Sequence, residues 1–167
     1  MGVDLEYISQ AKESPLLCEL TDEELGVLGS FMESSIYNRG DIILEQDTPG
    51  DSLLLIVEGR VEVFRKSAGG NDRTGHKDRV GERLMAVIGQ GESVGEMALL
   101  DGVPRSATVM AIDAVSVLTL TSDSYAHLRA TRPQLAIKVT LGIFRVLSRR
   151  LRAVNKSLEF VRYWLAE

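Results

Sequence analysis

The chain has 167 residues, a formal net charge of −5 at pH 7 and a hydrophobic fraction of 44%. Its length suits one domain with a hydrophobic core, and its composition excludes global disorder. No apolar run approaches the ~20 residues of a membrane span, the acidic N-terminus is not that of a signal peptide, and the single cysteine, Cys18, excludes a disulfide framework. We therefore expect one cytoplasmic domain over residues 1–167.

Helical patterns occupy the N-terminal part of the chain. Thr21, followed three residues later by Glu24, forms a capping box, in which each side chain binds a free backbone N–H at a helix start. Apolar residues then recur on one helix face, at Leu25, Leu28 and Met32. We predict N-terminal helices over about residues 1–35.

Short segments rich in Val, Ile and Leu follow, separated by turns rich in Gly, Asp and Pro. Regular short strands with frequent turns are typical of a closed or nearly closed antiparallel structure. The predicted strands are 42–44, 53–57, 61–64, 84–88, 107–112 and 115–120. Residues 66–83 are polar and rich in glycine and charge, which predicts a long hairpin loop. The fold class is therefore α+β: a jelly-roll-like antiparallel β-roll over 36–120, flanked by N-terminal helices and a long C-terminal helix.

The C-terminal part is again helical. Thr121 or Ser122 caps a predicted short helix over 121–132, and Pro133 suits the first turn of a long helix over 133–165. That helix carries the a/d stripe of a coiled coil: Leu147, Leu151, Val154, Leu158, Val161 and Leu165, extended backwards by Ile137, Thr140 and Phe144. The stripe predicts a homodimer through the C-terminal helix, and the alternative is a helix docked on its own β domain.

Charge is distributed unevenly along the chain. Residues 134–167 carry seven Lys or Arg against two acidic residues, whereas the rest of the chain is strongly acidic. Such asymmetry can mark contact with nucleic acid or a membrane surface. The interpretation we favour is a basic helix face that is solvated or that complements the acidic body.

The clearest ligand-binding chemistry lies between Gly95 and Thr108. Gly95 allows a tight turn and a close approach to a ligand, and the residues after it can form one helical turn whose free N–H groups point at an anion. Arg105 supplies a fork of donors suited to phosphate, beside the hydroxyl of Ser106. Glu96 can accept from sugar hydroxyls. These residues predict a cradle for an anionic sugar phosphate, and the alternative is a buried Glu96–Arg105 ion pair.

The same segment resembles the phosphate-binding cassette of the cyclic-nucleotide-binding domain family, found in catabolite-activator-type transcription factors, cyclic-nucleotide-dependent kinases and gated ion channels. The cassette reads Gly-Glu-(apolar)-Ala-Leu, a few residues, then Pro-Arg-(small)-Ala-Thr, and every position is filled here. Earlier turns and strands resemble the family in the same order, at 39–43, 50–57 and 58–63. The resemblance covers about residues 16–158. Two positions depart from the pattern: Gln46 replaces a common glycine and Val94 a common aromatic residue.

The resemblance implies a role for each cassette residue. Glu96 would accept from the ribose 2′-hydroxyl, Arg105 would pair with the cyclic phosphate, and the backbone N–H groups of Ala98 and Ser106 would complete the cradle. The expected ligand-binding residues are Gly95, Glu96, Met97, Ala98, Arg105, Ser106 and Ala107, with the base covered by Leu151, Val154 and Asn155 of the long helix.

The expected function is a regulatory sensor, not an enzyme, that binds a cyclic nucleotide and signals through its C-terminal helix to a partner protein. Ser106 is the residue that catabolite activators carry, which favours cyclic AMP, with cyclic GMP as the alternative.

With only His76 and His127 present, neither a histidine metal cluster nor any cofactor is expected. Two other functions stay open: an assembly module whose β-roll no longer uses nucleotide, and an accessory DNA-binding regulator. No DNA-binding output domain is expected, so nucleic-acid contact would need a partner or the basic helix.

Overall fold

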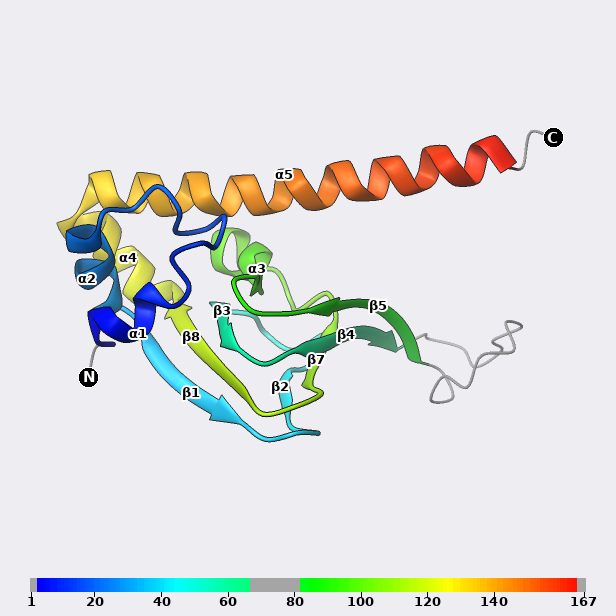
Figure 1. Cartoon of the computed structure of the whole chain (residues 1–167), viewed down its shortest axis with the longest axis horizontal. Coiled ribbons are helices and arrows are strands. Elements are labelled where there is room, and N and C mark those ends of the chain that lie inside the picture. Colours follow the sequence, from blue (N-terminus) through cyan, green and yellow to red (C-terminus); the bar gives the residue numbers. More distant parts are fainter. Residues whose placement is uncertain (1–2, 67–81, 165–167) are drawn as a thin grey trace.

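The computed structural model describes residues 3–66 and 82–164. Two four-stranded antiparallel sheets form the body of the molecule (Figure 1). The first sheet contains, in spatial order, β1 (Glu33–Tyr37), β8 (Val115–Thr121), β3 (Ser52–Glu58) and β6 (Ser93–Val94). The second contains β2 (Ile42–Leu44), β7 (Thr108–Ala111), β4 (Val61–Lys66) and β5 (Glu82–Ile88). The predicted α+β class and antiparallel β-roll are confirmed.

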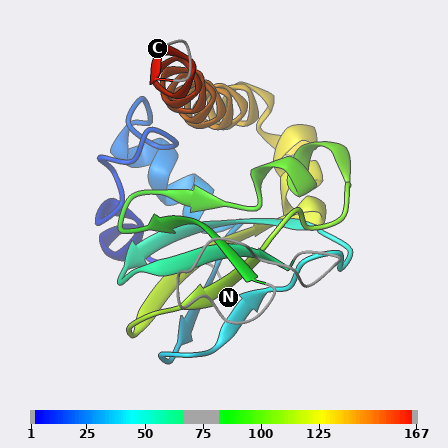
Figure 2. The same cartoon turned by 90° about the vertical axis from the view of Figure 1, so that its right-hand side faces the viewer.

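Helices cover one side of this roll. They are α1 (Leu5–Ser9), α2 (Asp22–Gly29), α3 (Glu96–Asp101), α4 (Ser122–Thr131) and α5 (Pro133–Trp164). Helices α2 and α4 lie beside the first half of α5, and α1 lies next to α2 (Figure 1). Over the described residues, the second half of α5 extends past α3 and runs above β5 without packing on it (Figure 1). Figure 2 shows α5 nearly end-on, with the two sheets beneath it. Within the described residues, no helix has both the length and the apolar character that a membrane span requires.

The helix ends follow the capping residues identified in the sequence. The Thr21 hydroxyl accepts from the backbone N–H of Glu24, and the Glu24 carboxylate accepts from the N–H of Thr21, so the capping box of α2 is confirmed. Thr121 caps α4 by accepting from the N–H of Ser124. Pro133 is the first residue of α5, where a missing N–H costs nothing.

The N-terminal prediction is wrong at two points. Helix covers only α1 and α2, with turns between them, and β1 already begins at Glu33, inside the segment predicted as helix. β1 lies at the edge of its sheet and Ile36 is exposed, so it lacks the apolar run that marks the other strands. The two-residue strand β6 also escaped prediction. The predicted 66–83 loop falls, over 67–81, outside the described residues.

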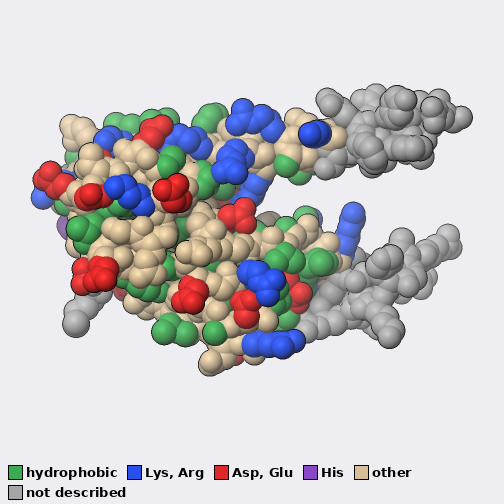
Figure 3. All heavy atoms as spheres, viewed as in Figure 1, with side chains coloured by type: hydrophobic (Ala, Val, Ile, Leu, Met, Phe, Trp, Pro, Cys, Tyr) green, Lys and Arg blue, Asp and Glu red, His purple; other side chains and the backbone are tan. Residues whose placement is uncertain are grey.

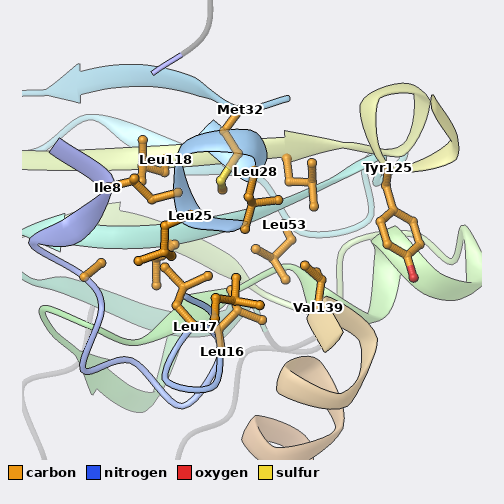
Figure 4. Close-up of a cluster of buried hydrophobic side chains, with 14 of the residues drawn as sticks. Ile8, Leu16, Leu17, Leu25, Leu28, Met32, Leu53, Leu118, Tyr125 and Val139 are labelled. Carbon is orange, nitrogen blue, oxygen red and sulfur yellow. The ribbon is translucent and has the colours of Figure 1, made fainter. Parts of the chain in front are cut away.

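Two hydrophobic clusters share the central strand β3. Leu53, Leu55 and Val57 face the helices, where they join the cluster drawn in Figure 4. The alternate residues Leu54 and Ile56 face the interior between the two sheets. Strand side chains alternate between the two faces of a sheet, and both faces of β3 are covered. This is why its sequence is a continuous apolar run.

The first half of α5 is attached to the N-terminal segment. Gly142 lies directly against the backbone of Leu16, where any side chain on the helix would collide. Lys138 donates to Glu24 at 2.6 Å, and Arg145 pairs with Glu19. These contacts fix the helix over the roll and set the direction of its second half.

Candidate functional site

A pocket of about 120 Å³ lies where α3, the roll interior and α5 meet. The seven residues predicted from the cassette all line it: Gly95, Glu96, Met97, Ala98, Arg105, Ser106 and Ala107. Its apolar wall comes from both sheets, through Val63, Ile88, Val94 and Val109. The site therefore combines a polar cassette with the open end of the inter-sheet core.

Glycine is required where the cassette begins. Gly95 has φ +82°, a left-handed conformation that side chains disfavour, and it forms the N-cap of α3. A Cβ on Gly95 would lie 2.5 Å from Nη1 of Arg105 and 2.6 Å from the carbonyl oxygen of Ser52. The backbone at this point thus leaves just enough room for the arginine side chain.

Arg105 is a buried cation whose hydrogen bonds all go to neutral oxygens of the described chain. Its side chain is 6% exposed. Nη1 donates to the carbonyl of Ser52 at 2.7 Å and to that of Gly95 at 3.4 Å, and Nη2 donates to the Ser52 hydroxyl at 2.8 Å. The nearest described carboxylate oxygen belongs to the exposed Asp51, 3.9 Å away. Burial lowers the pKa of Arg105, and the charge of Asp51 opposes this only in part.

Glu96 is a buried carboxylate with one oxygen in use. Arg150 of α5 donates to its Oε1 and, through the other guanidinium nitrogen, to the backbone carbonyl of Ser93. Oε2 is buried and has no hydrogen-bond partner in the part of the chain that is described. The alternative Glu96–Arg105 ion pair is therefore wrong: Arg150 is the partner of Glu96, and Arg105 is held by Ser52.

The three helix residues expected to cover a base do not line the pocket. Leu151, Val154 and Asn155 are exposed on the second half of α5. The α5 residue that lines the pocket is Arg150, which sequence reasoning missed. The sequence does contain a pattern that points to Arg150. Val139, Ile143 and Val146 form the buried face of α5, and Arg150 follows Val146 by four residues on the same face.

The two departures from the family pattern are accommodated. Asp47, not Gln46, takes the left-handed conformation of the turn, with φ +64°. The side-chain amide nitrogen of Gln46 donates to the Asp47 carboxylate, and its amide oxygen accepts from the backbone N–H of Lys66. Val94 is buried between the sheets and lines the pocket. Neither change removes a polar group from the site.

Among residues 3–66 and 82–164, no group of three His, Cys, Asp or Glu side chains is placed to hold a metal ion. The ring of His127 packs near that of Phe31, with centroids 5.5 Å apart. His76 lies outside the described residues. The polar chemistry of the pocket is thus a buried guanidinium and a carboxylate with a free oxygen.

Comparison with known proteins places this geometry in a family. The model of the cyclic nucleotide-binding domain matches residues 35–132. The chain is 32% identical over 152 residues to the cyclic AMP receptor protein of Thermus thermophilus, covering 91% of this chain and 64% of that protein. It is also 32% identical over 149 residues to glutaminase 2 of Bradyrhizobium diazoefficiens, covering 89% of this chain and 22% of that protein.

A solved structure supports the same assignment. A cyclic nucleotide-binding domain from Methylobacillus flagellatus superposes with a TM-score of 0.78 at 28% identity, covering 92% of this chain and 83% of that one. The chain spans less than two thirds of the length of both curated relatives. The matched range includes the roll and the whole cassette, so the predicted resemblance is confirmed and the chain belongs to the cyclic nucleotide-binding domain family.

Proposed function

We propose that this chain is a regulatory domain that binds cyclic AMP at the cassette and passes the binding signal to α5. The observation that carries the proposal is a pair of charged groups in one pocket, each of which has one interaction left unmade among the described residues. Arg105 is a buried cation without a close anion, and Glu96 is a buried carboxylate with a free oxygen. A ligand with a phosphate and a sugar hydroxyl completes both.

The phosphate part follows from the energetics of burial. A charge removed from water is costly unless a counter-charge and hydrogen bonds replace its hydration. Arg105 has hydrogen bonds to Ser52 and Gly95, but its only described counter-charge is the exposed Asp51 at 3.9 Å. A phosphate in the pocket supplies that charge at hydrogen-bond distance, in a geometry that a guanidinium recognises well.

The sugar part follows from Glu96. Its Oε1 is occupied by Arg150, and its Oε2 is free to accept one hydrogen bond. A ribose hydroxyl is a donor that a carboxylate oxygen accepts without bringing a second negative charge into the site. Because Arg150 belongs to α5, a ligand bound to Glu96 acts on the same carboxylate that holds the helix.

The choice of cyclic AMP is supported by two observations. The residue after the cassette arginine is Ser106, as expected for the catabolite activators, and it lines the pocket. The Thermus thermophilus relative is named a cyclic AMP receptor protein. Cyclic GMP is the competing ligand, because the Ser106 hydroxyl can also donate to guanine.

A homodimer through α5 is part of the proposal. Four residues of the predicted stripe are largely exposed: Ile137, Phe144, Leu151 and Val154. Thr140 and Leu147 instead face their own domain, where Thr140 bonds to Tyr125 and Leu147 packs on the core. The first half of α5 thus docks with one face and leaves another apolar face free for a second copy. The rest of the stripe lies outside the residues whose side chains are described: Leu158, Val161 and Leu165.

The charge pattern supports a helix that complements an acidic body. Lys138, Arg145 and Arg150 pair with the body residues Glu24, Glu19 and Glu96. Three other basic residues of α5 are exposed: Arg149, Arg152 and Lys156. Figure 3 shows Lys and Arg side chains, in blue, along this helix. We propose a partner protein in trans as the recipient of the signal, with no direct role for nucleic acid.

The test is isothermal titration of the wild type and of Arg105→Ala with cyclic AMP and cyclic GMP. We expect the wild type to bind cyclic AMP more tightly than cyclic GMP, and Arg105→Ala to lose about 100-fold in affinity, as two charge-assisted hydrogen bonds are removed. Circular dichroism and thermal unfolding establish that the variant is folded. A folded wild type that binds neither nucleotide contradicts the proposal and favours an assembly module. Tighter binding of cyclic GMP contradicts the choice of nucleotide.

A further inference from the structure

The two shortest hydrogen bonds of the Arg105 side chain go to one residue, Ser52, at the start of β3. Nη1 donates to the Ser52 carbonyl at 2.7 Å and Nη2 to the Ser52 hydroxyl at 2.8 Å. The two acceptors therefore take one donor from each terminal nitrogen, which together form the end of the guanidinium fork. Ser52 is buried and pairs with Thr121 at the end of the two inner strands of its sheet, so the anchor belongs to a strand with neighbours on both sides.

This anchoring leaves a defined set of donors free. A guanidinium has five coplanar N–H groups. Ser52 takes two of them and the Gly95 carbonyl accepts a longer bond from Nη1. Within the described residues, the Nε–H makes no hydrogen bond, and beyond the Ser52 hydroxyl Nη2 has only Asp51 at 3.9 Å. The Nε–H and the second N–H of Nη2 lie on one edge of the fork, and such an edge binds two phosphate oxygens at once.

We propose that Ser52 is a positioning residue for phosphate binding, which fixes the guanidinium of Arg105 so that its Nε–Nη2 edge is presented to the anion. The inference rests on the proposed function, because it concerns the same nucleotide site. Ser52 does not line the pocket, so it acts through Arg105 and not by touching the ligand.

Positioning matters because an arginine side chain has many rotamers. Restricting a free arginine costs side-chain entropy, and an anchored one has already lost that freedom before the ligand arrives. The Ser52 hydroxyl supplies half of the anchor, and the carbonyl, which no side-chain substitution removes, supplies the other half.

The experiment is titration with cyclic AMP of the wild type, Ser52→Ala, Ser52→Thr, Arg105→Ala and the double variant Ser52→Ala/Arg105→Ala. We expect Ser52→Ala to raise the Kd about tenfold, as one hydrogen bond to a charged group is lost. Threonine keeps the hydroxyl and should restore most of the affinity. In the Arg105→Ala background the serine change should have no further effect, since the group that it positions is absent.

A matched control is available on the neighbouring strand. Ser93 is even more buried than Ser52, and its hydroxyl has no hydrogen-bond partner among the described residues. Its contact with Arg150 is made by the backbone carbonyl, which Ser93→Ala retains. Ser93→Ala should therefore bind cyclic AMP like the wild type, which separates loss of the anchor from loss of a buried hydroxyl.

A readout without ligand completes the test. Rotation about the guanidinium C–N bonds is slow when both terminal nitrogens are held, so separate ¹⁵N signals for Nη1 and Nη2 of Arg105 are expected in the nucleotide-free wild type and averaged ones in Ser52→Ala. If the wild type binds, separate signals that persist in Ser52→Ala overturn the inference alone. So does a Kd of Ser52→Ala equal to that of the wild type. A wild type with separate signals that binds no nucleotide contradicts the proposed function itself, and the phosphate role of Ser52 with it.

Discussion

Arg150 in the long helix α5 forms an ion pair with Glu96 at the start of α3, joining residues 54 positions apart in the chain. The Glu96 side chain is 6% exposed and that of Arg150 36% exposed, so the pair lies at the boundary between pocket and solvent. Through this contact the second half of α5 reaches the proposed ligand site. A ligand bound to Glu96 would therefore act on the same carboxylate that holds the helix.

Replacing Arg150 by methionine should destabilise the fold by about 1–2 kcal/mol, because the buried Glu96 carboxylate loses its charged partner. Adding Glu96→Gln to that variant should recover much of the loss, since no buried charge is left unpaired. Urea unfolding of the three proteins measures both effects. Arg149→Met is the control, because Arg149 is exposed and makes no ion pair with a described residue; equal stability of the two single methionine variants would count against the pair.

Gly95→Ala and Gly102→Ala separate backbone strain from ligand binding. Both glycines have positive φ, so the backbone strain of each alanine should cost about 1 kcal/mol of stability, and the close contacts at Gly95 add to it there. Only at Gly95 does the new Cβ meet Arg105 and Ser52; at Gly102 nothing lies within 4 Å. We therefore expect a loss of nucleotide affinity of more than about tenfold for Gly95→Ala alone, as Arg105 is displaced. Similar affinities of the two variants in a titration would contradict this account of the site.

The contact between Lys138 and Glu24 should make stability depend on pH. The hydrogen bond from Lys138, with that from the Thr21 backbone, holds the pKa of Glu24 below its ordinary value of 4.5. A lowered folded-state pKa contributes stability that is present above the ordinary value and is lost as the pH falls through the lowered one.

Glu24→Gln, which keeps the capping geometry, should therefore be less stable than the wild type by about 0.5–1 kcal/mol at pH 7. The difference should shrink as the pH falls below 4.5. Denaturant unfolding across this range measures it. Glu23→Gln is the control, since Glu23 is exposed in the same helical turn and makes no ion pair with a described residue. A difference that does not change with pH would rule out the charge of Glu24 as its source.

Phe144→Glu should convert the proposed dimer into a monomer without unfolding the domain. Phe144 is 67% exposed in the single chain and lies on the free apolar face of α5, so a charge there is harmless alone but costly in a helix–helix seam. Sedimentation equilibrium gives the mass. Ile36→Glu is the matched control, because Ile36 is even more exposed but lies on β1. A wild type that is monomeric at all concentrations, or dimeric Phe144→Glu, contradicts the seam.

The sequence predicted the elements whose causes are local. The capping box at Thr21, the start of α5 at Pro133 and the doubly buried strand β3 each depend on neighbours in the chain. Strand β1 escaped prediction because it is held by its register with β8, about 80 residues away, and not by an apolar pattern of its own.

In the candidate site, too, the local features could be predicted from the sequence and the long-range contacts could not. The cassette residues are contiguous and share a motif, so they could be identified without a structure. The partners of its two charged groups could not: Arg105 is anchored by Ser52, 53 positions away, and Glu96 by Arg150, 54 positions away. Composition alone suggested pairing the two charges with each other, and only the fold shows that each has a separate partner.

The volume of the pocket has a kinetic consequence. At about 120 Å³ it is smaller than the roughly 300–1,000 Å³ typical of small-molecule sites, so binding of the proposed nucleotide would require the pocket to widen. If the widening precedes binding, association passes through a less populated, more open form, and its observed rate should level off at high nucleotide concentration, at the rate of opening. A stopped-flow trace that plateaus in this way would measure how often the free domain opens by itself.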